Sequence, residues 1–100
     1  MERDSRYDLI RPMYEKNNIL SLNDIFKYIP KSIIAQDIGK KVDRFTELMN
    51  KVEWFTMEEL FLIGKLCHFD RREILDLSLK EYEIQKGIVA KGQKQNTKQE

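Results

Sequence analysis

The sequence predicts an all-α protein of five to six helices in a single domain, and three observations support this. Apolar residues recur every three to four positions between Ile19 and Tyr82, whereas β-branched residues seldom alternate with polar ones. The composition has 41% hydrophobic and 35% charged residues but only four glycines and two prolines, which is typical of a compact helical protein. A chain of 100 residues is the size of one domain and too short for two independently stable halves.

The first helix is expected within residues 6–17, in an N-terminal extension over residues 1–20. Apolar side chains in this stretch have helical spacing, at Tyr7, Ile10, Met13 and Tyr14. Pro12 lies among them and lacks a backbone N–H, so it removes one helical hydrogen bond. We therefore expect a short or kinked helix.

A second helix is expected after Ser21 or Asn23, because either side chain can cap a helix N-terminus. Its apolar face would comprise Leu22, Ile25, Phe26 and Ile29. Pro30 should end it, since the residue before a proline is pushed toward an extended backbone.

The third and fourth helices are expected at about residues 31–38 and 41–50. Gly39 separates them, and we expect it to adopt the positive φ that the C-terminal turn of a helix commonly requires. The connection between the two helices is therefore a turn of only a few residues.

The last two helices have the most clearly marked starts. Thr56 and Asp70 each stand three positions before a glutamate, Glu59 and Glu73, which is the spacing of a capping box. The fifth helix is expected to bury Leu60, Ile63, Gly64 and Cys67. The sixth is expected to bury a selection of Ile74, Leu75, Leu79 and Tyr82.

The composition changes after the sixth helix. Residues 86–100 are rich in glycine, glutamine and lysine and poor in apolar residues, which predicts a disordered basic tail. An arm whose lysines track phosphate groups is the alternative for this segment.

Residues 31–50 carry the pattern of a helix-turn-helix. Two helices that cross steeply over a short turn need a small side chain where their backbones approach and a glycine in the turn, and Ala35 and Gly39 supply these. The two helices also need apolar residues that seal them together, and these are Ile34, Ile38, Phe45 and Leu48.

With one helix before this motif and two after it, residues 22–79 resemble the phage-repressor and Cro-like family. Residues 24–31, 44–48 and 55–60 are similar to small helix-turn-helix proteins common in Bacteroides-type bacteria. The resemblance implies a helix-turn-helix domain over residues 21–85. It also implies a sequence-specific DNA-binding protein that regulates transcription, with a mobile element as one source.

The docking of that family implies that helix 41–50 lies in the major groove, while the helix before it crosses the DNA backbone. Arg44 would then reach a guanine edge, Asn50 an adenine or the DNA backbone, and Val42 a thymine methyl group. The full set of outward residues is Lys41, Val42, Asp43, Arg44, Thr46, Glu47 and Asn50. Phosphate contacts are expected from Lys31, Ser32, Lys40 and Lys51. A homodimer on a two-fold DNA site would fit this arrangement.

The sequence departs from the family pattern in two ways. Lys40 follows Gly39 where an apolar residue usually packs under the turn, so the turn is looser or the lysine stem does the packing. Asp43 and Glu47 lie on the presumed DNA face, where a carboxylate repels phosphate. The two carboxylates also have a structural interpretation. Asp43 is a charge in the first turn of its helix, and Glu47 is a solvated partner of Arg44.

The overall charge supports an alternative function. Eighteen lysines and arginines against 17 acidic residues leave a net charge of +1, without the basic excess of many nucleic-acid binders. The alternative is a protein-interaction module on the same scaffold, which would present Asp43, Glu47, Trp54 and Phe55 to another protein. Burial in the core is nevertheless the favoured interpretation of the two aromatic residues. Under either function, a dimer seam is expected at Leu75, Leu79, Tyr82 and Ile88.

The sequence argues against an enzyme, a metal site or a cofactor. Cys67 and His68 are the only residues of their types, and adjacent helical residues point in different directions, so they cannot complete a metal site. The chain has no glycine-rich phosphate loop, and nothing indicates a small-molecule substrate. The lone cysteine is expected to be a buried free thiol, and the chain lacks a long apolar run. We therefore expect a cytoplasmic protein that does not contact a membrane.

Overall fold

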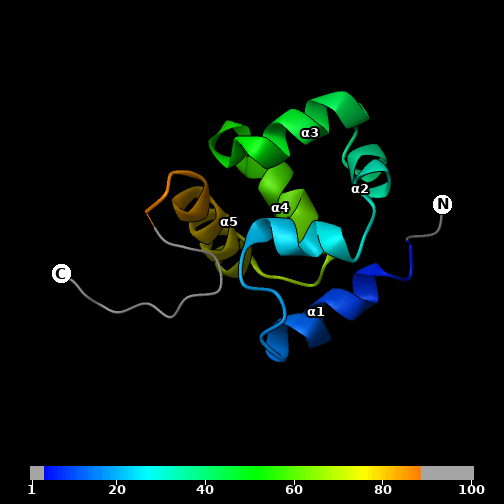
Figure 1. The fold of residues 1–100 in the computed structure, drawn as a ribbon. Helices are drawn as coiled ribbons and strands as arrows, with labels where there is room; N and C mark the ends of the chain where they lie inside the picture. Colours follow the sequence, from blue (N-terminus) through cyan, green and yellow to red (C-terminus); the bar gives the residue numbers. More distant parts are fainter. Residues whose placement is uncertain (1–3, 89–100) are drawn as a thin grey trace.

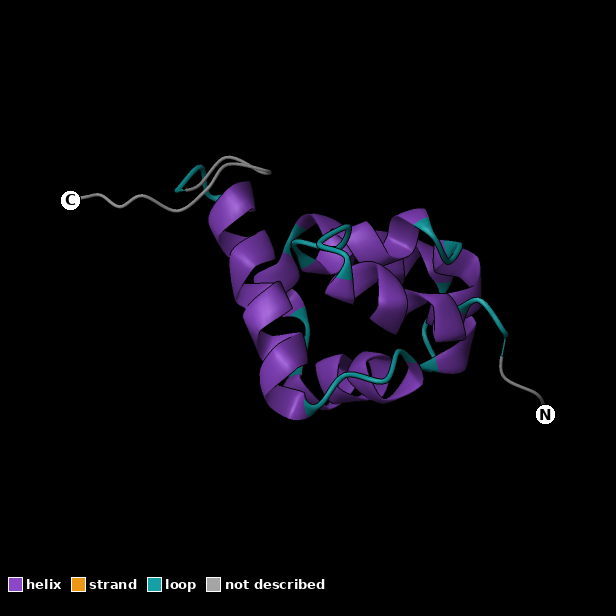
Figure 2. Cartoon of the chain, turned by 90° about the horizontal axis from the view of Figure 1, so that it is seen from below, coloured by secondary structure: helices purple, strands orange, loops and turns teal. Residues whose placement is uncertain are grey.

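A computed structural model describes residues 4–88, and these residues form five α-helices and two short 3-10 helices without a strand. The helices pack around one shared core (Figure 1), and the view from below shows the same all-helical arrangement (Figure 2). The prediction of a small all-α domain is confirmed for this part of the chain. Most of the expected basic tail, residues 89–100, lies outside the described residues. The elements in order are α1 (Tyr7–Glu15), η1 (Leu22–Lys27), α2 (Lys31–Asp37), α3 (Val42–Asn50), η2 (Val52–Trp54), α4 (Met57–Leu66) and α5 (Arg71–Gln85).

Helix α1 contains Pro12, as predicted, and belongs to the common core. The side chains of Tyr7 and Ile10 are completely buried in that core. The Tyr7 hydroxyl donates a 2.6 Å hydrogen bond to Asp37 Oδ2 at the end of α2. Burial, together with the Asp37 carboxylate, raises the pKa of Tyr7 above its ordinary value. The segment expected as an N-terminal extension is thus tied to the rest of the fold by both apolar and polar contacts.

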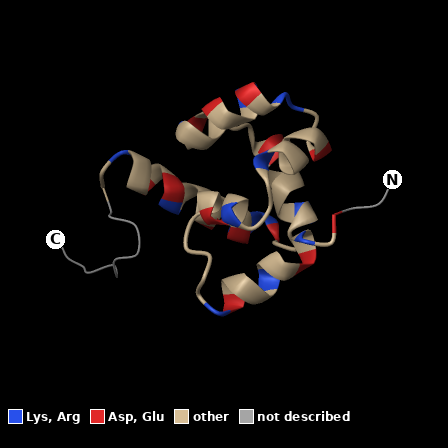
Figure 3. Ribbon diagram, turned by 45° about the vertical axis from the view of Figure 1, so that its right-hand side comes forward, with Lys and Arg blue, Asp and Glu red and all other residues tan. Residues whose placement is uncertain are grey.

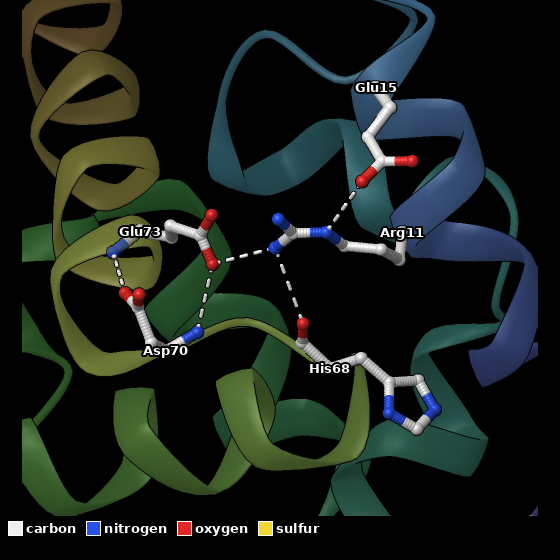
Figure 4. A network of polar contacts seen from close by, with 5 residues as sticks. All are labelled: Arg11, Glu15, His68, Asp70 and Glu73. Atoms are coloured by element: carbon white, nitrogen blue, oxygen red, sulfur yellow. Dashed lines mark hydrogen bonds and ion pairs between the residues drawn. The ribbon is translucent and has the colours of Figure 1, made fainter.

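Arg11 connects α1 to α5. Its Nη1 atom donates to Glu73 Oε1 at 2.6 Å and its Nε atom to Glu15 Oε2 at 3.1 Å (Figure 4). The hydrogen bond from Arg11 holds the pKa of Glu73 below its usual range. Glu73 Oε1 also accepts from the backbone N–H of Asp70, so the same carboxylate caps α5 and anchors α1.

The expected second α-helix is a 3-10 helix instead. Element η1 ends at Lys27, and its residues Leu22 and Ile25 are completely buried. The 3-10 geometry places side chains three positions apart in line, which brings both onto the core. The Asp24 carboxylate accepts from the backbone N–H groups of Leu20 and Ser21, so the entry to this element is fixed by side-chain hydrogen bonds.

A tight turn joins α2 to α3. Gly39 has φ +77°, which confirms the predicted positive φ, and the next residue donates its N–H to Ala35 O at 2.8 Å. Ala35 is completely buried, and α2 and α3 contact each other directly. Helix α3 begins at Val42, one residue later than expected, because Lys41 is in an extended conformation as its N-cap residue.

Both predicted capping boxes are present. Thr56 Oγ1 accepts from the Glu59 N–H at 3.1 Å and the Glu59 carboxylate accepts from the Thr56 N–H at 2.9 Å. Asp70 and Glu73 make the equivalent pair of bonds at the start of α5. Gly64 lets α5 approach α4, since a Cβ atom at that position would lie 3.1 Å from Ile74 Cβ.

The buried face of α5 takes part of the expected set. Ile74 is completely buried and Leu75 and Tyr82 are half-buried against the core, whereas Leu79 is 54% exposed. Leu77 and two polar residues, Ser78 and Glu81, are also buried on this face. The Ser78 hydroxyl donates to Ile74 O, and Glu81 Oε1 accepts from the Asn23 N–H. These bonds make burial of polar groups tolerable, and they explain why an apolar pattern does not reveal this face.

Aromatic rings fill the centre of the core beneath α3. The Phe45 ring packs edge-on against Phe26 at 5.1 Å and against Phe55 at 5.9 Å between centroids. Phe55 is therefore a core residue, as predicted, but the same expectation is wrong for Trp54, which is 48% exposed. Cys67 is buried and does not form a disulfide, as predicted. Among residues 4–88, no helix has the length and apolar character needed to span a membrane.

Candidate nucleic-acid interface on α3

Helix α3 has one buried and one exposed face. Phe45 and Leu48 point into the core and are almost completely inaccessible to solvent. The opposite face carries most of the residues expected to contact DNA. Exposed on or beside it are Lys41, Val42, Asp43, Arg44, Glu47, Asn50 and Lys51.

Arg44, Glu47, Lys51 and Trp54 form a surface cluster, which we call the Trp54 cluster. Arg44 Nη1 lies 2.9 Å from Glu47 Oε1, and the Arg44 guanidinium lies 5.7 Å from the centre of the Trp54 ring. The Lys51 ammonium lies 5.4 Å from the same ring. Two cations thus contact the same exposed aromatic ring, an interaction typically worth about 0.5–1 kcal/mol for each exposed cation.

Element η2 holds Trp54 in this position. Val52 is buried, and its backbone N–H donates to the Gln85 side chain of α5 at 3.0 Å. Glu53 forms an ion pair with Lys86 at 2.9 Å. The backbone that leads to the indole is therefore anchored by two contacts to the C-terminal part of the fold, while the indole itself is 48% exposed.

Lys40 forms an ion pair that its sequence position did not predict, although packing of its stem under the turn was one of the two expected possibilities. Its Nζ atom lies 2.5 Å from Glu59 Oε2, and Glu59 is only 8% exposed. Burial raises the pKa of Glu59, but the hydrogen bonds from Lys40 and from the Thr56 backbone outweigh it and lower that pKa. The lysine stem is half-buried, so Lys40 fills the place under the turn where an apolar residue was expected.

The remaining predicted contact residues differ in their availability. Lys31 and Ser32 are exposed in the first turn of α2. Thr46 is half-buried and donates its hydroxyl hydrogen to Val42 O at 3.0 Å, so its donor is used within the helix. Asp43 lies in the first turn of α3, where a carboxylate interacts favourably with the helix dipole.

Charges of both signs are interspersed along α3 (Figure 3). Lys41 and Arg44 are balanced by Asp43 and Glu47, which leaves the helix and its N-cap residue neutral. Lys31 on α2 and Lys51 after α3 are also exposed and add two positive charges. Together these six expected contact residues comprise four cations and two carboxylates, an excess of two positive charges.

Trp54 is the main residue of this face that the sequence analysis placed wrongly. An aromatic pair next to a predicted helix is usually buried, and here only Phe55 follows that rule. Lys51 lies three positions before Trp54, and the structure shows a helical turn between them. This lysine was the signal in the sequence that could have indicated an exposed indole. Among residues 4–88, no group of histidine, cysteine or acidic side chains is arranged to hold a metal ion.

Comparison with protein-family models, with curated proteins and with solved structures found no match for this chain.

Proposed function

We propose that α2, the turn at Gly39 and α3 form a helix-turn-helix that binds double-stranded DNA in a sequence-specific manner and regulates transcription. One observation carries the proposal. The residues of α3 that point away from the core are open to solvent along the whole helix, while a tight glycine turn sets α2 against its N-terminal end. A helix presented in this way can enter the major groove with its N-terminal residues at the base edges.

The proposed contacts divide into phosphate and base contacts. Lys31 on α2, Lys41 before α3 and Lys51 after it are exposed and would neutralise phosphates. Arg44 would read a guanine edge by leaving Glu47. That exchange costs little, because an exposed ion pair contributes about 1 kcal/mol or less.

Glu47 has a compatible role in the complex. Once Arg44 has moved to a base, the Glu47 carboxylate is released and can accept a hydrogen bond from a cytosine amino group. Asp43, one turn earlier, can do the same. The two carboxylates would therefore favour particular base pairs and weaken binding to all others, which is consistent with specific binding from a nearly neutral chain.

The chain provides its own reporter for this proposal. Trp54 is the only tryptophan, and it lies against Arg44 and Lys51, so its fluorescence should change when DNA engages either cation. Titration with random-sequence duplex DNA across a salt series would measure the affinity. Three phosphate contacts per chain, from Lys31, Lys41 and Lys51, predict a slope of log affinity against log salt of about −2.7, since each contact contributes about −0.9.

Variants separate the expected roles. Lys41→Ala should weaken binding to all sequences and reduce the salt slope by about one contact. Arg44→Ala should relax specificity at one base pair of a selected site, at a cost of about 1–3 kcal/mol there. Lys16→Ala is the matched control, because Lys16 is exposed at the end of α1, on the opposite side of the molecule from α3 (Figure 1). Absence of binding at low salt, or equal losses in all three variants, would contradict the proposal.

A protein-interaction module is the second candidate, and the exposure of Trp54 favours it. An indole that is 48% exposed is a typical anchor for a protein partner. The buried Phe55 cannot take part in such an interface as the protein stands. This function predicts that a partner retained by the wild-type chain is lost with Trp54→Ala, while the affinity for DNA is negligible at any salt concentration.

A further inference from the structure

The outer face of α4 is apolar and bordered by charges. Leu62 is 46% exposed at its centre, with Phe61 half-buried beside it. Two surface hollows of about 370 and 420 Å³ adjoin Leu62, one lined by Glu58 and Phe61, the other by Leu66 of α4 and Asp37 of α2. Each hollow is larger than a leucyl side chain, so this face can accept an apolar group from another molecule.

The charges on this face are arranged symmetrically about its apolar centre. Glu58 precedes the pair Phe61 and Leu62 by about one turn, and Lys65 follows the pair by about one turn. The spacing places all four residues on one stripe of the helix. Glu58 and Lys65 are both exposed, and neither forms an ion pair with another residue within 4–88.

We propose that this stripe of α4 is a self-association surface that binds a second copy of the chain. In an antiparallel pair of helices related by a two-fold axis between positions 61 and 62, Glu58 faces Lys65 of the partner subunit, and the reverse contact forms at the other end. In the same register, Leu62 of each copy lies opposite Phe61 of the partner subunit, so the apolar residues of both copies meet at the axis. A two-fold interface must be complementary to itself, and a stripe with acid at one end, base at the other and leucine between them meets that condition.

The α5 seam considered from the sequence lacks this complementarity. Leu79 is exposed there, but the neighbouring charges Asp76 and Lys80 already form an ion pair within the helix at 3.2 Å. One helix face is smaller than a standard protein interface of about 1,600 Å², so we expect weak association, with a Kd on the order of 100 µM. This inference does not depend on DNA binding, and its tests contain no DNA.

Sedimentation equilibrium of the full chain between about 10 µM and 1 mM would test the proposal. We expect a monomer–dimer equilibrium that Leu62→Asp weakens at least tenfold. Leu79→Asp changes another exposed leucine in the same way and should leave the dimer unchanged. A chain that stays monomeric throughout this range, or a dimer that only Leu79→Asp disrupts, would overturn the proposal.

Charge exchange gives a sharper test that does not depend on the apolar contact. Glu58→Lys and Lys65→Glu should each abolish self-association, because each places like charges opposite one another at both ends. An equimolar mixture of the two variants should associate, and so should the double variant that carries both changes. Thermal unfolding followed by circular dichroism would verify that every variant is folded. Single variants that dimerise like the wild type, or a mixture that does not associate, would refute the arrangement.

Discussion

Lys40→Met removes the ammonium group that pairs with Glu59, and it separates a structural role of this lysine from a DNA-binding one. The two side chains differ in accessibility, with 32% of Lys40 and 11% of Glu59 exposed. Removing one partner of a fully buried pair costs about 3–5 kcal/mol, whereas an exposed pair is worth about 1 kcal/mol or less. Glu59 also keeps its hydrogen bond from the Thr56 N–H. We therefore expect a loss of about 1.5 kcal/mol, closer to the exposed limit.

Urea and thermal denaturation would measure this loss. For a domain of this size, about 1.5 kcal/mol corresponds to a fall in Tm of roughly 6–12 °C. Lys41→Met is the matched control, because Lys41 is the next residue and its side chain is exposed. This variant should change the free energy of unfolding by no more than about 0.5 kcal/mol.

A double-mutant cycle with Glu59→Gln isolates the interaction. Glutamine keeps an oxygen that can accept from the Thr56 N–H but carries no charge to be left unpaired. In that background, Lys40→Met should cost clearly less than it does alone. If Lys40→Met is as stable as the wild type, or costs the same in both backgrounds, the ion pair does not stabilise the fold and the reasoning fails.

Three further predictions concern stability. Gly39→Ala should cost about 1–2 kcal/mol in urea denaturation purely through backbone strain at φ +77°, because a Cβ there meets no atom within 4 Å. Gly64→Ala should cost about 1 kcal/mol, since crowding against Ile74 outweighs the gain in helix propensity; a variant as stable as the wild type would mean that α5 can shift. The pKa values of Glu59 and Glu73 are lowered by folding, so the unfolded chain binds protons more tightly. Stability should therefore be fully present above about pH 5 and decline as the pH falls below it, and a fold that is more stable at pH 3 than at pH 7 would contradict this.

Local sequence signals predicted the elements whose ends are set by local chemistry. The capping boxes at Thr56 and Asp70 were predictable because each is completed within four residues. The turn at Gly39 was predictable because a positive φ strongly favours glycine. The same signals could not distinguish η1 from an α-helix, since the two share apolar spacing over a segment this short.

The candidate site was predicted in part. The exposed face of α3 follows from the apolar positions of Phe45 and Leu48, which fix the opposite side of the helix. The partners of its charges did not follow from the sequence. Lys40 is close to Glu59 only because the turn after α2 packs against the start of α4.

By itself, the sequence determined the helical class, most helix boundaries and the turn between α2 and α3, because each depends on interactions within a few residues of the chain. Only the tertiary structure decided which face of α5 is buried, since Ser78 and Glu81 become acceptable in the core through hydrogen bonds to specific partners. It also decided that Phe55 enters the core while Trp54 stays at the surface between Arg44 and Lys51. Those outcomes depend on contacts between segments far apart in the chain, and such contacts leave no local pattern in the sequence.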